Sequence, residues 1–140
     1  MTPAIYLDAS ALLKLVRVEA ETAALRTYVG QHSLRITSAL SVVEVRRAAM
    51  RSGIREERKK ADEVLDSVVV IKLVPEMLDL AAALDPPTLR SLDAIHLATA
   101  MFLVREEAVP ISAFVVYDRR LAVAVRAAGL SVASPGTRTL

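Results

Sequence analysis

Two aspartates each follow a short apolar run that is expected to form a buried β-strand. Asp8 follows the run Ala4–Leu7, and Asp118 follows the run Ala113–Tyr117. Ligands of parallel sheets bind beyond the carboxyl ends of the strands, so both carboxylates stand where a binding site is expected. Each aspartate also precedes an expected helix, and capping of that helix explains either residue equally well when it is considered alone.

Two further acidic residues lie within helical patterns. Glu44 interrupts an apolar stretch at residues 40–45, where an ionised carboxylate is costly unless it is paired or binds a metal. A salt bridge to Arg47 or Arg51 is the structural alternative. Asp93 lies in the first turn of an expected helix, a position that the helix dipole favours for a carboxylate whether or not it has a catalytic role.

Taken together, these four carboxylates predict a divalent-cation site. If they converge, their mutual repulsion forces some of them to bind protons at neutral pH, unless a cation removes the conflict. An oxygen-only ligand set selects Mg²⁺ or Mn²⁺ over zinc, and the chain has no cysteine. Such ions bind substrate phosphates, so the pattern indicates phosphodiester chemistry.

The elements that must position these residues alternate between short apolar runs and helical patterns. The expected strands are Ala4–Leu7, Leu34–Thr37, Val68–Val74, Ala113–Tyr117 and Leu130–Ala133. The expected helices are Ser10–Val16, Glu19–Tyr28, Ala39–Arg51, Arg55–Ser67, Glu76–Leu84, Ser91–Val104 and Arg119–Ala128. This alternation predicts an α/β fold, a three-layer α/β/α sandwich with a mostly parallel central sheet of four to five strands. The strands are nearly all apolar, as expected for strands that are buried on both faces.

Length and composition predict a single domain over residues 1–140. Hydrophobic residues make up 54% of the chain but aromatic residues only 4%, so the core is expected to be aliphatic. The apolar runs are too short to span a bilayer, and no targeting segment is evident. The absence of cysteine fits a reducing compartment, so the expected location is the cytoplasm.

Basic residues are concentrated in one part of a nearly balanced chain. The formal net charge is +2, but residues 44–60 contain seven basic and three acidic side chains. A solvated helix face with ion pairs such as Glu56–Lys60 is the simpler interpretation. A patch that attracts phosphate is the functional alternative.

Three other residues have a structural and a functional interpretation. His96 lies three residues after Asp93 on an apolar helix. We interpret it as a hydrogen-bonded histidine near the core rather than as a general acid or base. Leu12 and Val16 are one turn apart and are explained equally well by core packing and by a dimer face.

The stretches that carry the four acids resemble, in the same order, those of the PIN-domain nucleases, and among them the VapC-type toxins of bacterial toxin–antitoxin pairs. These stretches are Tyr6–Leu12, Thr37–Glu44, Leu89–Ala100 and Phe114–Leu121. The resemblance covers essentially the whole chain and implies a PIN-like fold. It also implies a Mg²⁺- or Mn²⁺-dependent endoribonuclease that acts as a homodimer and is restrained by a cognate antitoxin protein.

The resemblance assigns roles to individual side chains. The implied catalytic and metal-binding residues are Asp8, Glu44, Asp93 and Asp118, with Ser10 in support. Asp8 and Asp93 are implied to be the strongest ligands, and Ser10 to orient the Asp8 carboxylate. Many relatives carry Thr or Ser two residues before the fourth acid. This chain has Val116 there and so departs from the family pattern beside Asp118.

Four basic residues near these aspartates are candidates for contact with RNA. They are Lys14, Arg17, Arg119 and Arg120. Arg119 and Arg120 follow Asp118 directly, where they can contact a phosphate or simply neutralise the acidic site.

Three alternatives compete with the nuclease interpretation. A phosphatase of the haloacid dehalogenase type needs a second Asp two positions after the first, and this chain has Ser10 there. A phosphoacceptor receiver domain needs a pair of neighbouring acids after the first strand, and here Asp8 stands alone. A catalytically inactive PIN-like binding module is the third alternative, although this chain keeps all four acids.

Overall fold

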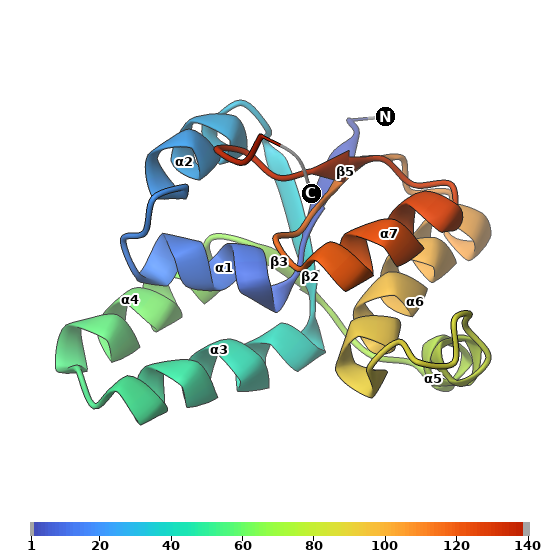
Figure 1. The fold of residues 1–140 in the computed structure, drawn as a ribbon, viewed down its shortest axis with the longest axis horizontal. Coiled ribbons are helices and arrows are strands. Elements are labelled where there is room, and N and C mark those ends of the chain that lie inside the picture. The colour runs from blue at the N-terminus through green and yellow to red at the C-terminus, as the bar shows by residue number, and fades with distance from the viewer. Residues whose placement is uncertain (1, 139–140) are drawn as a thin grey trace.

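A five-stranded parallel sheet forms the centre of the computed structural model, which describes residues 2–138 (Figure 1). The strands are β1 (Ala4–Leu7), β2 (Leu34–Ser38), β3 (Val69–Ile71), β4 (Ile111–Val115) and β5 (Val132–Ala133). Their order in the sheet is β3-β2-β1-β4-β5, and each neighbouring pair is parallel. The predicted α/β class and the predicted parallel sheet are confirmed. The first and last residues of the domain predicted over 1–140 lie outside the described residues.

The path of the chain through the sheet reverses beside β1. From β1 the chain moves outward through β2 to β3, and it then returns to place β4 on the other side of β1. Leu7 pairs with Val115 where these two central strands end, and the backbone N–H of Asp8 donates to the carbonyl oxygen of Val115 at 3.3 Å. This edge is a topological switch point, the place where open α/β sheets bind ligands.

Helices cover both faces of the sheet and complete the predicted three layers (Figure 1). They are α1 (Ala9–Val16), α2 (Thr22–Gly30), α3 (Ala39–Ser52), α4 (Arg55–Asp66), α5 (Pro75–Ala82), α6 (Ser91–Glu106) and α7 (Arg119–Ala127). Ile5 and Leu7 of β1 pack into one apolar cluster with residues of α1 to α4. Tyr6, between them, faces the opposite cluster, which α6 and α7 supply. This alternation is the two-residue period of a strand that is buried on both faces.

The core resolves one interpretation that the sequence left open. Leu12 is fully buried and Val16 is 8% exposed, and both belong to the cluster between α1 and the sheet. Core packing therefore explains this pair, and a dimer face does not.

Several predicted element boundaries were wrong. The strand predicted over Ala113–Tyr117 is β4, which ends at Val115, and the strand predicted over Leu130–Ala133 is the two-residue β5. The strand predicted over Val68–Val74 is only the three-residue β3, and its Val69 and Val70 are exposed because β3 lies at the edge of the sheet. The helix predicted to begin at Glu19 begins at Thr22. The Thr22 hydroxyl donates to the carbonyl oxygen of Lys14 at 2.7 Å, which ties the connection to the end of α1. No helix in residues 2–138 is long and apolar enough to cross a membrane.

Candidate active site

Asp8 lies buried at the carboxyl end of β1 and caps α1. Its Oδ1 atom accepts hydrogen bonds from the backbone N–H of Ala11 at 3.0 Å and from the hydroxyl of Ser10 at 2.6 Å. Burial raises the pKa of this carboxyl to about 6, although the hydrogen bond from Ser10 opposes the shift. Both protein bonds go to one oxygen, so Oδ2 keeps its lone pairs for another partner.

Ser10 connects the two strands that flank the switch point. While its hydroxyl donates to Asp8, its Oγ atom accepts from the backbone N–H of Tyr117 at 3.1 Å. Tyr117 belongs to the segment between β4 and α7, and Asp118 is the next residue. This one hydroxyl therefore joins the Asp8 carboxylate at the start of α1 to the segment that follows β4.

Glu44 projects from α3 toward a buried histidine of α6. The Nε2 atom of His96 lies 2.6 Å from Oε1 of Glu44, and its Nδ1 atom lies 2.8 Å from the hydroxyl of Tyr6. Tyr6 is fully buried on β1, and this burial, with the charge of Asp8 adding to it, raises the pKa of its hydroxyl. The protonated hydroxyl of Tyr6 donates to Nδ1 of His96. The histidine therefore carries its own proton on Nε2, which donates to Glu44, and in this tautomer all three side chains are hydrogen-bonded.

This arrangement excludes the salt bridge that the sequence offered as an alternative for Glu44. Glu44 does not pair with Arg47 or Arg51 as the structural alternative proposed, because α3 turns it toward His96. His96 is buried and hydrogen-bonded, as we expected, and its partners are Tyr6 and Glu44.

Asp93 and Asp118 are joined by one arginine side chain. Arg90 donates from Nε to Oδ2 of Asp93 at 3.3 Å and from Nη2 to Oδ2 of Asp118 at 3.1 Å. Asp118 also caps α7, because its Oδ1 accepts from the backbone N–H of Leu121 at 2.9 Å. Burial raises the pKa of Asp93, Arg90 lowers it, and the charge of Asp118 raises it again.

Two cavities open beside these carboxylates. The larger one, of about 650 Å³, is lined by Pro86, Thr88, Leu89, Arg90, Asp93, Arg119, Arg120 and Val123. A smaller one, of about 260 Å³, is lined by Glu44, Arg90, Ser91, Leu92 and Asp93. Arg90 and Asp93 border both spaces, so they stand at the boundary between the carboxylate of Glu44 and the arginines of α7.

The four predicted acids gather at the same end of the sheet. The charge of Asp93 raises the pKa of Asp8, and the charge of Asp118 raises that of Asp93, so these side chains lie within electrostatic reach of one another. The donor set is all oxygen and partly buried, which suits Mg²⁺ or Mn²⁺. Within residues 2–138, no three acidic or histidine side chains are already close enough to hold an ion together. Arg90 lies between the carboxylates of Asp93 and Asp118 and pairs with both.

The four candidate RNA contacts divide into two pairs. Arg119 and Arg120 are exposed and line the larger cavity. The amine of Lys14 pairs with Glu19 and Glu21, and it lies over the ring of Tyr117.

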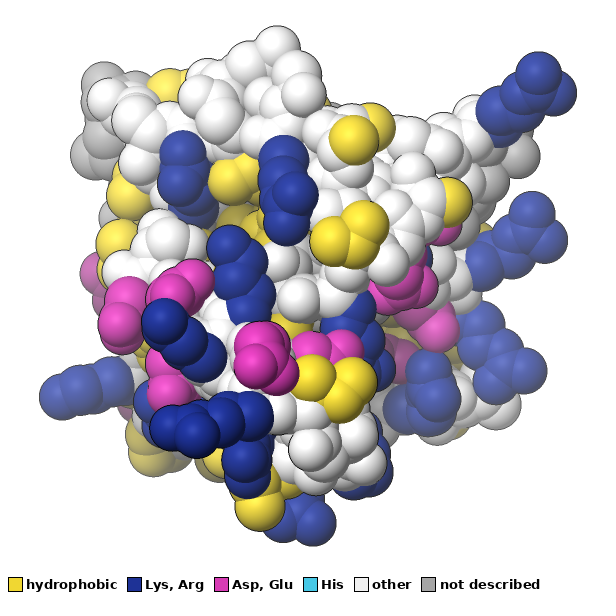
Figure 2. Space-filling view, turned by 90° about the vertical axis from the view of Figure 1, so that its left-hand side faces the viewer, with side chains coloured by type: hydrophobic (Ala, Val, Ile, Leu, Met, Phe, Trp, Pro, Cys, Tyr) yellow, Lys and Arg dark blue, Asp and Glu magenta, His cyan; other side chains and the backbone are white. Residues whose placement is uncertain are grey.

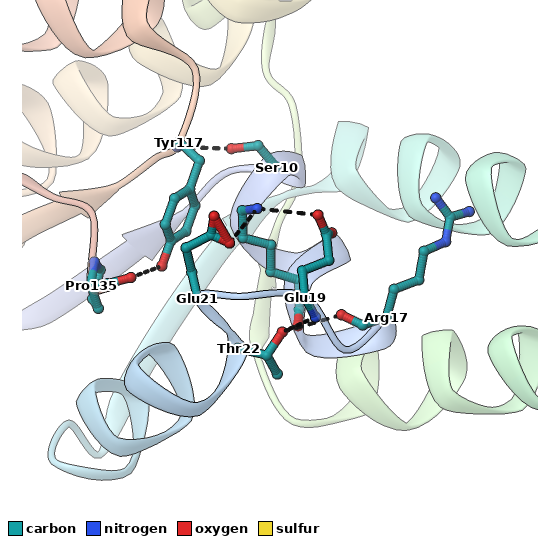
Figure 3. A network of polar contacts seen from close by, with 8 residues as sticks. Ser10, Arg17, Glu19, Glu21, Thr22, Tyr117 and Pro135 are labelled. Carbon is teal, nitrogen blue, oxygen red and sulfur yellow. Dashed lines mark hydrogen bonds and ion pairs between the residues drawn. The ribbon is translucent and has the colours of Figure 1, made fainter. Parts of the chain in front are cut away.

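Arg17, at the end of α1, binds groups of the two helices that cover it. It pairs with Glu57 of α4 at 2.9 Å and donates to the carbonyl oxygen of Ala48 in α3 at 2.7 Å. Figure 3 shows the surrounding network, in which Tyr117 also donates its hydroxyl to the carbonyl oxygen of Pro135. Lys14 and Arg17 therefore already have anionic or carbonyl partners within the chain.

The basic segment of residues 44–60 forms the outer surface of α3 and the start of α4. Figure 2 shows the side of the molecule where Lys and Arg side chains gather among Asp and Glu side chains. Arg46 pairs with Asp62, and Lys60 pairs with Glu63 rather than with the predicted Glu56. The interpretation as a solvated helix face with ion pairs fits these contacts.

Two residues of the site were not identified from the sequence. Arg90 and Tyr6 lie within stretches that resemble the family, but neither is among the site residues that the sequence predicts. Arg90 pairs directly with Asp93, three residues further along the chain, and with Asp118. Tyr6 reaches Glu44 only through His96. The one available hint was the polar hydroxyl of Tyr6 within a strand that is otherwise apolar.

Comparisons with known proteins agree with this geometry. The PIN domain family model matches residues 5–126. Ribonuclease VapC47 of Mycobacterium tuberculosis (strain CDC 1551 / Oshkosh) is 43% identical over 136 residues, which cover 94% of this chain and 97% of that protein. Ribonuclease VapC46 of Mycobacterium tuberculosis (strain ATCC 25618 / H37Rv) is 40% identical and covers 94% and 98%.

A solved structure shares the fold at lower sequence identity. A chain of a toxin–antitoxin complex from Klebsiella pneumoniae superposes with a TM-score of 0.68 at 16% identity, covering 94% of this chain and 97% of that one. The family-model match and the two relatives span nearly the whole chain, including the segments that carry all four acids. The chain therefore belongs to the PIN domain family and, within it, to the group of the VapC proteins.

Proposed function

We propose that this protein is a Mg²⁺- or Mn²⁺-dependent endoribonuclease that acts as the toxin of a toxin–antitoxin pair. The observation that carries the proposal is the gathering of Asp8, Asp93 and Asp118 at the switch point between β1 and β4, with Glu44 beside them. The names of the relatives at 40–43% identity, both ribonucleases, support the same activity.

Asp8 and Asp93 are the proposed principal ligands of the cation. Asp8 offers the Oδ2 atom that its helix cap and Ser10 leave available, and Asp93 lies on the border of both cavities. Glu44 and Asp118 complete the proposed set of cation ligands. When bound, Mg²⁺ or Mn²⁺ polarises a phosphate oxygen and makes water a stronger nucleophile.

The remaining chemistry belongs to side chains of this chain. Glu44, fixed by His96, accepts a proton from the attacking water. In-line attack on phosphorus breaks the P–O3′ bond and leaves a 5′-phosphate and a 3′-hydroxyl. This reaction does not use the 2′-hydroxyl, so a preference for RNA over DNA must come from contacts that recognise the ribose.

An antitoxin protein and a second copy of the chain are the proposed protein partners. The antitoxin would cover the acidic pocket and so exclude RNA. The structural neighbour from Klebsiella pneumoniae is a toxin–antitoxin complex, which supports a partner of this kind. Leu78 of α5 and Leu92 of α6 are exposed apolar side chains, and they are available for such contacts.

Mapping of RNA 5′ ends after induced expression tests the proposed activity. Wild type is expected to create new 5′-phosphate ends that Asp8→Asn does not create. Asp66→Asn is a matched control, because Asp66 is an exposed aspartate at the end of α4, and it is expected to give the wild-type map. Identical maps from wild type and Asp8→Asn would overturn the ribonuclease proposal and favour an inactive binding module.

A further inference from the structure

Arg90 holds a position that a bound cation would also need. Its guanidinium bridges Asp93 and Asp118, two of the four candidate ligands, through separate N–H groups. Among the described residues these two carboxylates are the only partners of the guanidinium, and the Arg90 side chain is 66% exposed. The side chain is therefore restrained at its tip but has open space around it.

A guanidinium and a dication compete for the same carboxylates. Arginine stays protonated at every pH that a protein tolerates, so it cannot give up its charge when a second cation approaches. Asp93 is half-buried, where like charges repel more strongly than they do in water. Occupation of Asp93 and Asp118 by Mg²⁺ or Mn²⁺ should therefore release the guanidinium of Arg90.

The larger cavity provides a second place for the released side chain. Arg90 already lines it, together with Arg119 and Arg120 of α7. Neither Arg119 nor Arg120 forms an ion pair with any residue in 2–138, so both guanidinium groups are available to an anion. Three arginines against one carboxylate give this space a net positive lining, which suits a phosphate.

The shape of the cavity fits a nucleotide better than a lone anion. Its volume of about 650 Å³ lies in the range that small-molecule sites occupy. Leu89, Pro86 and Val123 supply an apolar wall beside the arginines. Apolar surfaces and guanidinium planes both pack against bases, and guanidinium groups pair with phosphates in a bidentate manner.

We propose that Arg90 is a two-position residue that couples cation binding to RNA binding. Without the cation it neutralises Asp93 and Asp118. With the cation in place it turns into the neighbouring cavity and, with Arg119 and Arg120, binds a phosphate of the RNA next to the one that is cut. This inference rests on the proposed ribonuclease function. It adds a phosphate subsite that Arg90 completes only when the cation is bound.

Two equilibrium titrations test the proposal without measuring cleavage. The first titrates Mn²⁺ alone into the protein by calorimetry. The second titrates a 5′-phosphorylated uridine dinucleotide into the protein at saturating Mn²⁺. Arg90→Gln is expected to tighten Mn²⁺ binding about 3- to 10-fold, because the competing cation is gone. The same variant is expected to weaken dinucleotide binding about 10-fold.

Two matched variants separate the contact of Arg90 with Asp93 and Asp118 from the general effect of removing a positive charge. Arg119→Gln removes the same charge from the cavity but touches neither carboxylate, so it is expected to weaken the dinucleotide and to change Mn²⁺ affinity less than 2-fold. Arg105→Gln removes an exposed charge near the end of α6 and is expected to leave both affinities unchanged.

The outcomes distinguish this inference from the proposed function. Unchanged or weaker Mn²⁺ binding by Arg90→Gln overturns the competition, and unchanged dinucleotide binding by that variant overturns the phosphate subsite. In both cases the proposed function stands if wild type binds Mn²⁺ and Asp8→Asn does not. If neither wild type nor Arg90→Gln binds Mn²⁺, the cation site fails and this inference fails with it.

Discussion

The Nε2 atom of His96 lies 2.6 Å from Oε1 of Glu44 and connects α6 to α3 across the end of the sheet. The hydroxyl of Tyr6 supports the histidine from β1 at 2.8 Å, and both rings are buried. A carboxylate held this way loses little conformational freedom when it acts, because its orientation is set before substrate arrives. The chain Tyr6–His96–Glu44 therefore links the core of the sheet to the proposed proton acceptor.

The first prediction concerns the hydroxyl at the buried end of this chain. Tyr6→Phe removes one oxygen and leaves Nδ1 of His96 buried without a donor, which should lower the free energy of unfolding by about 1–3 kcal/mol. Urea denaturation measures the change. Tyr28→Phe is the control, because the Tyr28 ring is only half-buried, and a change within about 0.5 kcal/mol is expected there. Equal changes in the two variants would contradict the assigned hydrogen bond.

The second prediction separates the structural role of Glu44 from its proposed chemistry. Glu44→Gln keeps an oxygen that accepts from His96 but removes the charge and the basicity. Stability should therefore change by less than about 1 kcal/mol, while RNA cleavage should fall about 10²- to 10⁴-fold. A cleavage assay on purified protein beside a denaturation curve provides both numbers. Cleavage at the wild-type rate would show that Glu44 is not the proton acceptor.

Much of the fold could be predicted because β1, β4 and the helices between them follow simple periodic patterns. β1 is buried at every position since both faces of the sheet are covered, and β4 is buried over its last three residues. Asp8 and Asp118 could be placed at the switch point because each directly follows an apolar run. The length and the exposure of the edge strand β3 could not be predicted, since an exposed β-branched run has the same sequence pattern as a buried one.

The partners of the acids were harder to predict than their positions. Glu44 and His96 are 52 residues apart, and their contact depends on how α3 and α6 pack. Arg90 reaches Asp118, 28 residues further along the chain, only because α6 and α7 begin at the same edge of the sheet. Side-chain pairing between elements follows from packing, and the pattern of one sequence carries little information on it.

The third prediction follows from the buried carboxyl of Asp8 in protein without divalent ions. Its pKa of about 6 in the folded state lies above the unfolded value of about 3.9, so the folded state favours the protonated form. The resulting stability is fully present below about pH 4, and it is lost as the pH rises through 6, at a cost of about 3 kcal/mol. Asp8→Asn should not show this loss.

Chemical denaturation between pH 4 and 7 measures this difference. The advantage of Asp8→Asn over wild type should grow with pH, while the difference between Asp66→Asn and wild type should stay flat. A constant difference for Asp8→Asn would mean that Asp8 ionises normally. Adding Mn²⁺ at pH 7 should stabilise wild type but not Asp8→Asn, because only an ionised carboxylate at this position binds the cation.

The fourth prediction tests the bridge that Ser10 forms. Ser10→Ala removes the donor to Asp8 and the acceptor for the Tyr117 backbone N–H together. We expect a loss of about 1–3 kcal/mol in unfolding free energy and a further rise in the pKa of Asp8, because that hydrogen bond favours the charged form. Ser112→Ala, which removes a longer bond at 3.3 Å to a backbone carbonyl, is the control.

Calorimetric titration with Mn²⁺ at pH 7.5 tests the central claim, that acids from distant parts of the chain form one cation site. Wild type and Asp66→Asn should bind Mn²⁺ saturably and with equal affinity, whereas Asp8→Asn and Asp93→Asn should each lose that binding while remaining folded. The claim of one shared cation site would be contradicted if Mn²⁺ binding survived in both Asp8→Asn and Asp93→Asn. It would also be contradicted if neither wild type nor Arg90→Gln bound Mn²⁺.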